Sequence, residues 1–211
     1  TESIGVAEEL VINGSFTNGN TFDPTGINGF NTGYLYLPDL PGVDNELIPD
    51  TGTRGYSITT DGRNVHTNFW GLDYTRNTTG PRNMMVINGK GPQLTIWEQI
   101  VTVEPNTEYY FSAWAMSLNN AGPFARLQFE VNGTPVGTVA NLAPGVENNS
   151  NYGWTRFYSD PVWNSGSVSG PITIRIINLE PSNPGNDFAL DDISFCTLKP
   201  FIVLTSGVCS D

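Results

Sequence analysis

The side chains best suited to catalysis in this chain of 211 residues are two pairs of carboxylates. The pairs are Asp191 with Asp192 and Glu98 with Glu130. Hydrolysis of a glycosidic bond needs two carboxyl groups about 5 to 10 Å apart, flanking that bond. Asp191 and Asp192 cannot flank one bond, because adjacent residues of a strand point to opposite faces. The single histidine, His66, has no serine or cysteine nucleophile motif nearby, so the sequence predicts a protein that is not an enzyme.

Strands must position these side chains, because helical signals are nearly absent. No window of about eleven or more residues has apolar residues at helical spacing without a cluster of Gly, Pro or Asn interrupting it. Alternating segments separated by turn residues predict six strands, with three shorter ones before them. The six are Thr95–Val103, Tyr109–Met116, Ala125–Val131, Trp154–Trp163, Pro171–Asn178 and Phe188–Phe195. The three shorter ones are Glu9–Phe16, Tyr56–Thr60 and Met84–Asn88.

This strand pattern, with 23 glycines and 15 prolines in the chain, predicts an all-β fold: a jelly-roll β-sandwich of two antiparallel sheets. No internal repeat and no linker divides the sequence. We therefore expect one sandwich domain from residue 9 to residue 195. Residues 1–8 are expected to form an N-terminal extension, and residues 196–211 a C-terminal extension with a strand of its own.

The charge of the chain excludes some classes of partner. Nine basic against 21 acidic residues give a net charge of -12 and an isoelectric point near 4.3. Such a surface repels nucleic-acid phosphates and anionic lipid headgroups. The longest apolar runs, such as Phe201–Leu204, fall far short of the roughly 20 residues that a membrane helix needs. We expect no nucleic-acid partner and no membrane insertion, and a mature form without a leader segment.

Three stretches, read in order, carry a family resemblance: Leu10–Phe16 (LVINGSF), Tyr56–Asn88, and Asn186–Phe195 (NDFALDDISF). With the WEQ strand and the stretches EPNTEYYFSAWA and VNGTPVG, they resemble the galactose-binding-like β-sandwich of secreted bacterial carbohydrate-binding modules, of the type of families 4, 9 and 22. The resemblance spans Glu9–Phe195. It implies a non-catalytic domain, secreted or on the cell surface, that recognises a polysaccharide or another glycan in binding or adhesion.

The resemblance also implies a structural Ca²⁺ ion between the end of the first strand and the last strand. Alternation places Asp191 on the same face as Ile193 and Phe195, where a carboxylate without a partner would be costly. Ca²⁺ takes six to eight oxygen ligands and would remove that cost. The candidate ligands are Ser15, Thr17, Asp73, Asp191 and Asp192. Relatives often have Glu at the position of Thr17. The absence of that carboxylate would weaken the site, or Asp73 or Asp192 would bind the ion in its place. In the alternative, Asp191 pairs with an arginine or caps backbone donors.

Sugar-binding faces combine aromatic rings, which stack on pyranose rings, with amides and carboxylates that bind hydroxyls. The expected strands offer this mixture on neighbouring faces, and a loop adds one more ring. The candidates are Trp97, Gln99, Trp114, Glu130 and Trp154. Each tryptophan has an alternative role in core packing, because alternation shows which residues share a face but not which face is exposed.

The two cysteines, Cys196 and Cys209, follow the last expected strand of the domain. An even number of cysteines in a chain expected to be secreted predicts one disulfide. Closing the loop of 12 residues between them would stabilise the folded state by roughly 3 kcal/mol. The alternative is two free thiols in a mobile tail.

The ends of the chain suggest an alternative function. The apolar run Phe201–Thr205, and the alternating residues of Thr1–Glu8, could each add to a sheet edge of their own domain or of another copy. In the second case the protein would be a structural subunit of an extracellular filament or surface layer, assembled by exchange of terminal strands.

Overall fold

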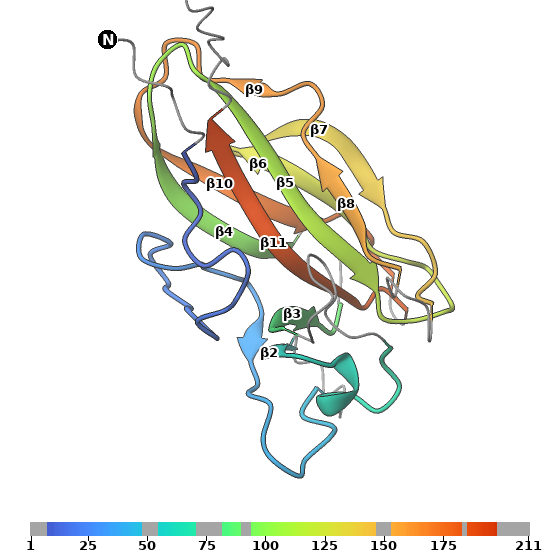
Figure 1. Ribbon diagram of the computed structural model, residues 1–211. Coiled ribbons are helices and arrows are strands. Elements are labelled where there is room, and N and C mark those ends of the chain that lie inside the picture. Colours follow the sequence, from blue (N-terminus) through green and yellow to red (C-terminus); the bar gives the residue numbers. More distant parts are fainter. Residues whose placement is uncertain are drawn as a thin grey trace, which may run out of the picture.

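The computed structural model describes residues 8–47, 55–70, 82–89, 94–146, 153–182 and 185–197, and these residues form a jelly-roll β-sandwich, as predicted (Figure 1). The larger sheet has the order β1-β2-β3-β11-β5-β8, and β9 also pairs with β5. Its strands are β1 (Leu35–Tyr36), β2 (Gly55–Thr59), β3 (Met84–Ile87), β11 (Phe188–Thr197), β5 (Glu108–Ser117), β8 (Thr155–Tyr158) and β9 (Trp163–Asn164). The smaller sheet consists of β4 (Leu94–Val103), β10 (Gly170–Asn178), β6 (Arg126–Val131) and β7 (Thr134–Asn141).

The helical content of the described residues is small. It consists of one 3-10 turn, η1 (Gly62–Asn64), which Asp61 caps by accepting a hydrogen bond from the backbone N–H of Arg63. In the same part of the chain, no helix is long and apolar enough to cross a membrane.

Alternate residues of each strand build the core between the sheets. On β5, Phe111 and Ala113 are completely buried, and on β10 so are Ile174 and Ile176. The ring of Phe129 on β6 stacks on that of Phe111 with centroids 3.9 Å apart. Because β-strands present every second side chain to the same face, these contacts follow from the alternation in the sequence.

Two of the strand predictions need correction. The expected strand Trp154–Trp163 is two strands, β8 and β9, separated by residues 159–162. The expected strand Glu9–Phe16 is a series of turns in which Glu9 makes one isolated bridge to Cys196.

A β-bulge in β11 overturns the predicted direction of Asp191. The pairing of β11 with β5 shifts between Asp191 and Ser194, and Asp192 has a positive φ of 49°. An inserted residue reverses the alternation beyond it. Leu190 and Ile193 therefore both face the core between the sheets, whereas Asp191 lies opposite Trp114 and does not share a face with Ile193.

The glycine of the NGSF motif lets the N-terminal segment lie directly against this bulge. The backbone N–H of Ile193 donates to the carbonyl oxygen of Gly14 at 2.9 Å. A Cβ atom at Gly14 would lie 1.9 Å from the carbonyl oxygen of Ile193, so only glycine fits there. Asn13, with φ 54°, and Phe16, with φ 51°, complete the turns that bury the Phe16 ring.

A second core, distinct from the one between the sheets, covers part of the outer face of the larger sheet. It consists of Leu47, Val65, Phe69, Met84, Val86, Met116, Leu118, Trp154 and Ala189. Met116 on β5 and Ala189 on β11 are paired sheet residues, and Leu47, Val65 and Phe69 come from the loops around η1. Loops thus cover part of this face, while Arg156 and Tyr158 on β8 remain exposed.

Candidate functional site

An aromatic platform lies at the uncovered part of the outer face of the larger sheet. We use this name for Tyr110 and Trp114 on β5 together with Arg156 and Tyr158 on β8. The strands pair Trp114 with Arg156 and Ser112 with Tyr158, while the neighbouring pair Ala113 and Phe157 faces the core. Alternation therefore places all four platform side chains on the outer face.

Contacts between the platform side chains hold them in place. The rings of Tyr110 and Tyr158 stack with centroids 5.7 Å apart, and the guanidinium carbon of Arg156 lies 5.7 Å from the centroid of the Tyr110 ring. Arg156 also donates from Nη2 to the buried hydroxyl of Ser112 at 3.0 Å. Cation–π contact and stacking of this kind contribute about 0.5–1.5 kcal/mol each and limit the rotamers of the rings.

The exposure of the platform suits a flat ligand with many hydroxyl groups. Tyr158 is 47% exposed, Arg156 is exposed, and Tyr110 and Trp114 are half-buried. Burial raises the pKa of Tyr110, and the nearby charge of Arg156 opposes this only in part, so its hydroxyl stays protonated. Aromatic faces stack on apolar pyranose faces, while phenol and guanidinium groups bind hydroxyls.

Two of the predicted sugar-binding residues are internal. The Trp97 side chain has no exposed surface and belongs to the core between the sheets. Gln99 is 1% exposed, and its amide binds the backbone of Ile12, accepting from its N–H at 3.0 Å and donating to its carbonyl at 2.7 Å. Gln99 thus joins the N-terminal segment to β4. Neither residue can contact a glycan in this conformation, which corrects their assignment to the sugar-binding face.

The other three predicted residues do not lie together. Trp114 is part of the platform, and Trp154 is a 4% exposed member of the second core. Glu130 lies on the smaller sheet, directly opposite Arg175. The Nε atom of Arg175 is 3.5 Å from Glu130 and 3.4 Å from Glu98 on the other neighbouring strand. Glu98 and Glu130, the pair considered above for glycosidase catalysis, thus both form an ion pair with Arg175.

The predicted calcium ligands come together only in part. Ser15 and Asp192 line one hollow of about 200 Å³, beside the contact between Gly14 and β11. Thr17 reaches Ser15 with a hydroxyl contact of 2.7 Å, Asp191 does not line the hollow, and Asp73 lies outside the described residues. In the part of the chain that is described, no three His, Cys, Asp or Glu side chains are grouped as a metal site requires.

A residue absent from the predicted calcium set occupies the same hollow. Glu9 lines it, and its carboxylate accepts hydrogen bonds from the backbone N–H groups of Val11 and Phe195 and from the Ser194 hydroxyl. These donors already engage Glu9 in closing the N-terminal segment onto β11. Of the predicted ligands, the hollow thus holds the side-chain oxygens of Ser15 and Asp192, against the six to eight oxygen ligands that Ca²⁺ takes.

The disulfide predicted between Cys196 and Cys209 stays a prediction, because Cys209 lies outside the described residues. Cys196 is half-buried on β11, where burial raises the pKa of its thiol. No other described residue is bonded to its sulfur by a disulfide.

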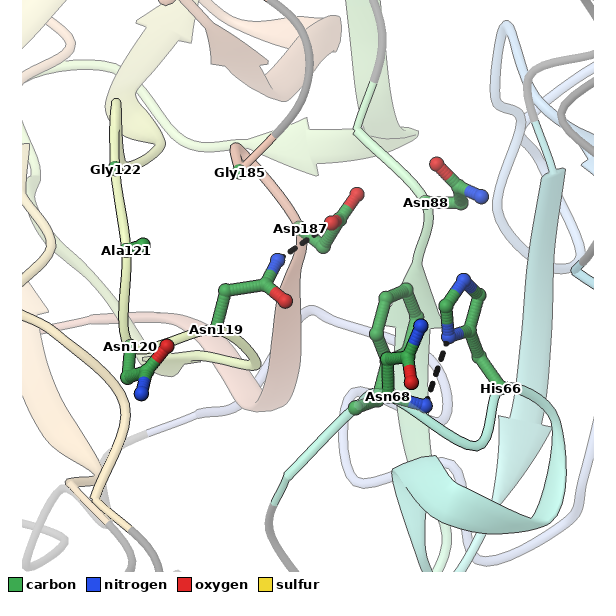
Figure 2. A pocket seen from close by; sticks show the side chains of 10 residues that line it. His66, Asn68, Asn88, Asn119, Asn120, Ala121, Gly122, Gly185 and Asp187 are labelled. Atoms are coloured by element: carbon green, nitrogen blue, oxygen red, sulfur yellow. Dashed lines mark hydrogen bonds between the residues drawn. The ribbon is translucent and has the colours of Figure 1, made fainter.

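A second accessible cavity, the rim pocket, lies at the loop end of the same sheet and has a volume of about 410 Å³. Its polar side chains are His66, Asn68, Asn88, Asn119, Asn120 and Asp187. Figure 2 shows Asn119 and Asn120 on one wall, His66 and Asn68 on the other, and Asp187 between them.

The rim pocket and the platform residues other than Trp114 were not identified from the sequence, and the reasons differ. The platform residues Tyr110, Arg156 and Tyr158 alternate with buried residues of β5 and β8, so the period of two could have indicated them. The rim pocket has no such signal, because its residues come from four separate loops and strand ends.

Comparison with known proteins establishes the fold and not a family. No family model matches the sequence, and no curated protein matches it. A Stig cyclase, Fisc, from Fischerella sp. TAU, solved in complex with (3Z)-3-(1-methyl-2-pyrrolidinylidene)-3H-indole, is similar at a TM-score of 0.57 and 13% identity, over 91% of this chain and 98% of that one. The CBM22-1 xylan-binding domain of Paenibacillus barcinonensis Xyn10C is similar at a TM-score of 0.51 and 11% identity, over 95% and 99%.

The tandem CBM22-1-CBM22-2 structure from the same protein gives a TM-score of 0.54 at 12% identity, over 92% of this chain and 47% of the tandem. The described residues therefore share the jelly-roll fold of these solved structures, which agrees with the fold that the sequence predicted. The Stig cyclase, which is named as an enzyme, has a similar fold. The fold therefore does not decide between a binding protein and an enzyme.

Proposed function

We propose that this protein is a non-catalytic carbohydrate-binding module that acts outside the cell and binds a neutral polysaccharide on the aromatic platform. The observation that carries the proposal is a pair of stacked tyrosine rings with an arginine, fixed by mutual contacts on an outer sheet face that also holds the half-buried Trp114. A net charge of -12 disfavours acidic glycans. The likeness to a xylan-binding domain supports a polysaccharide as the ligand class.

Calorimetric titration with neutral oligosaccharides of xylose, glucose, mannose and galactose tests this proposal. Because shallow platforms bury little of a ligand, we expect dissociation constants of roughly 10 µM to 1 mM for at least one series, with affinity that rises with chain length. The absence of heat and of NMR shifts with every series would refute it. Conversion of the oligosaccharide, followed by chromatography, would contradict the non-catalytic part.

A structural calcium ion is part of the proposal. With Ser15 and Asp192 as ligands, Ca²⁺ would join the N-terminal segment to β11 and bind only the folded state, which raises the melting temperature. We expect removal of metal by EDTA to lower the melting temperature by several degrees and Ca²⁺, but not Mg²⁺, to restore it. Asp192→Asn should remove this response. An unchanged melting temperature in protein shown by elemental analysis to be metal-free would contradict the site.

A structural subunit of an extracellular filament is a second candidate function, favoured by one observation. A groove of about 440 Å³ runs beside β4, an edge strand, and we call it the edge groove. The described chain near both ends lines it, with Leu10, Ile12 and Thr197. Residues 26–31 cover the edge of β4 as far as Ile100, whose N–H donates to Gly26. Terminal segments of a second copy could add a strand in this groove.

Light scattering after size exclusion, with Ca²⁺ and with chelator, tests this second function. A filament subunit is expected to give polymers that disappear when residues 198–211 are deleted. A monomer at all concentrations would exclude assembly and leave the glycan proposal untouched.

A further inference from the structure

The rim pocket combines a ligand-sized volume with side chains that use one polar atom in a hydrogen bond within the protein and keep a second polar atom for a ligand. Its 410 Å³ lies within the range of about 300–1,000 Å³ typical of small-molecule sites. Asn119 donates from Nδ2 to the carboxylate of Asp187 at 2.5 Å, and Asn88 donates from Nδ2 to the carbonyl of Leu47 at 2.9 Å. Each of these amides is thus fixed by its nitrogen and keeps its Oδ1 as an acceptor for a ligand.

His66 is fixed in the same way and presents a donor. Its Nδ1 accepts a hydrogen bond from the backbone N–H of Asn68 at 3.2 Å, and its ring stacks on Phe69 with centroids 4.0 Å apart. Burial lowers the pKa of His66 below its ordinary value, so the imidazole is neutral at pH 7. With Nδ1 acting as acceptor, the proton is on Nε2, which remains a hydrogen-bond donor.

Hydrogen bonds hold the Asp187 carboxylate in place between the two walls of the pocket. Asp187 is 8% exposed and accepts from the backbone N–H of Gly89 at 2.8 Å as well as from Asn119 (Figure 2). A Cβ atom at Gly89 would lie 1.8 Å from the backbone oxygen of Asn186, so the close approach that supplies this N–H requires glycine. Side chains locked by such contacts bind without paying the full entropy of ordering.

We propose that the rim pocket is a second binding site, separate from the aromatic platform, that takes a single neutral pyranose or a similar uncharged polyol. Vicinal hydroxyls both donate and accept, which matches the acceptors of Asn88 and Asn119 and the donor of His66. The carboxylate of Asp187 and the acidic surface disfavour an anionic sugar. Six of the ten residues that line the pocket have polar side chains, so an apolar ligand would leave several polar groups unpaired.

Asn68 and Asn120 make the test possible without loss of the fold. Both are exposed, and neither side chain has a hydrogen-bond partner among the described residues. The double variant Asn68→Ala/Asn120→Ala therefore removes two ligand contacts from opposite walls. Ala121→Trp closes the pocket from the exposed side. Asn141→Ala, an exposed amide at the end of β7, is the matched control.

The measurement is a ¹⁵N NMR titration of the whole protein with methyl glycosides of glucose, galactose, mannose and xylose at up to about 50 mM, a range set by expected millimolar affinity. We expect at least one glycoside to shift the amides of Asn68, Gly89 and Asn119, the double variant to weaken binding at least about threefold, and Ala121→Trp to abolish it. Galacturonate should give no shifts.

Three results would overturn the proposal. The first is no shift with any glycoside, the second is shifts that both variants leave unchanged, and the third is shifts with an indole but not with the sugars, which would indicate an aromatic ligand. None of these results affects the aromatic platform. Failure of Trp114 and Tyr158 to respond to oligosaccharides would refute that site and leave the rim pocket standing.

Discussion

Replacement of Trp97 by alanine is expected to lower the free energy of unfolding by about 3–5 kcal/mol, the range for a fully buried tryptophan that leaves a cavity. The side chain has no exposed surface and packs in the core between the sheets. Equilibrium unfolding in guanidinium chloride, followed by circular dichroism, measures the change. Under conditions where the variant is folded, its affinity for oligosaccharides should match that of the wild type.

Trp97→Phe separates packing from hydrogen bonding. The Trp97 Nε1 atom is buried and has no hydrogen-bond partner among the described residues. Phenylalanine keeps most of the apolar volume and removes this unpaired donor, so it should cost much less than alanine. A Trp97→Ala protein of unchanged stability that had lost glycan binding would show that the ring is a platform and not part of the core.

Trp114→Ala is expected to weaken oligosaccharide binding at least about tenfold, because truncation of an aromatic hot-spot residue costs about 2 kcal/mol or more. Trp114 is half-buried and also packs against the second core, so some stability will be lost with it. Tyr158→Ala, at a 47% exposed position, should weaken binding with little change in stability. Calorimetric titration measures each affinity.

Phe22→Ala is the matched control for these two variants. Phe22 is 46% exposed and lies in the N-terminal loop, where its backbone bridges to Phe30 and not to the platform strands. Its removal should leave affinity unchanged. If Trp114→Ala and Tyr158→Ala both bind like the wild type, the platform is not the glycan site.

Alternation gave most of the strands and of the core, but not which face of a strand is buried. Trp97 and Gln99 share one face of β4, as predicted, and that face is the core. On β5 both faces are apolar, because the second core covers the outer face beside Met116. A period-2 pattern that is apolar on both sides cannot separate a platform tryptophan from a core tryptophan.

The direction of Asp191 could not be obtained from the sequence for a different reason. The bulge at Asp192 adds one residue to β11, and nothing in the stretch DDIS marks it. One inserted residue moves the side chains of all later residues in the strand to the opposite face of the sheet. The strand β7 was missed because its residues are exposed or half-buried throughout, with Pro135 and Gly137 within it. The rim pocket depends on loops brought together only by the finished fold.

A ¹⁵N NMR titration with the oligosaccharide series that binds best tests the central claim most directly. Glycan binding on the platform predicts shifts in the amides of β8 and of residues 110–116 of β5, saturating together and absent in Trp114→Ala. Shifts confined to β4, β10 and β6 of the smaller sheet would contradict it, since no platform residue lies on those strands.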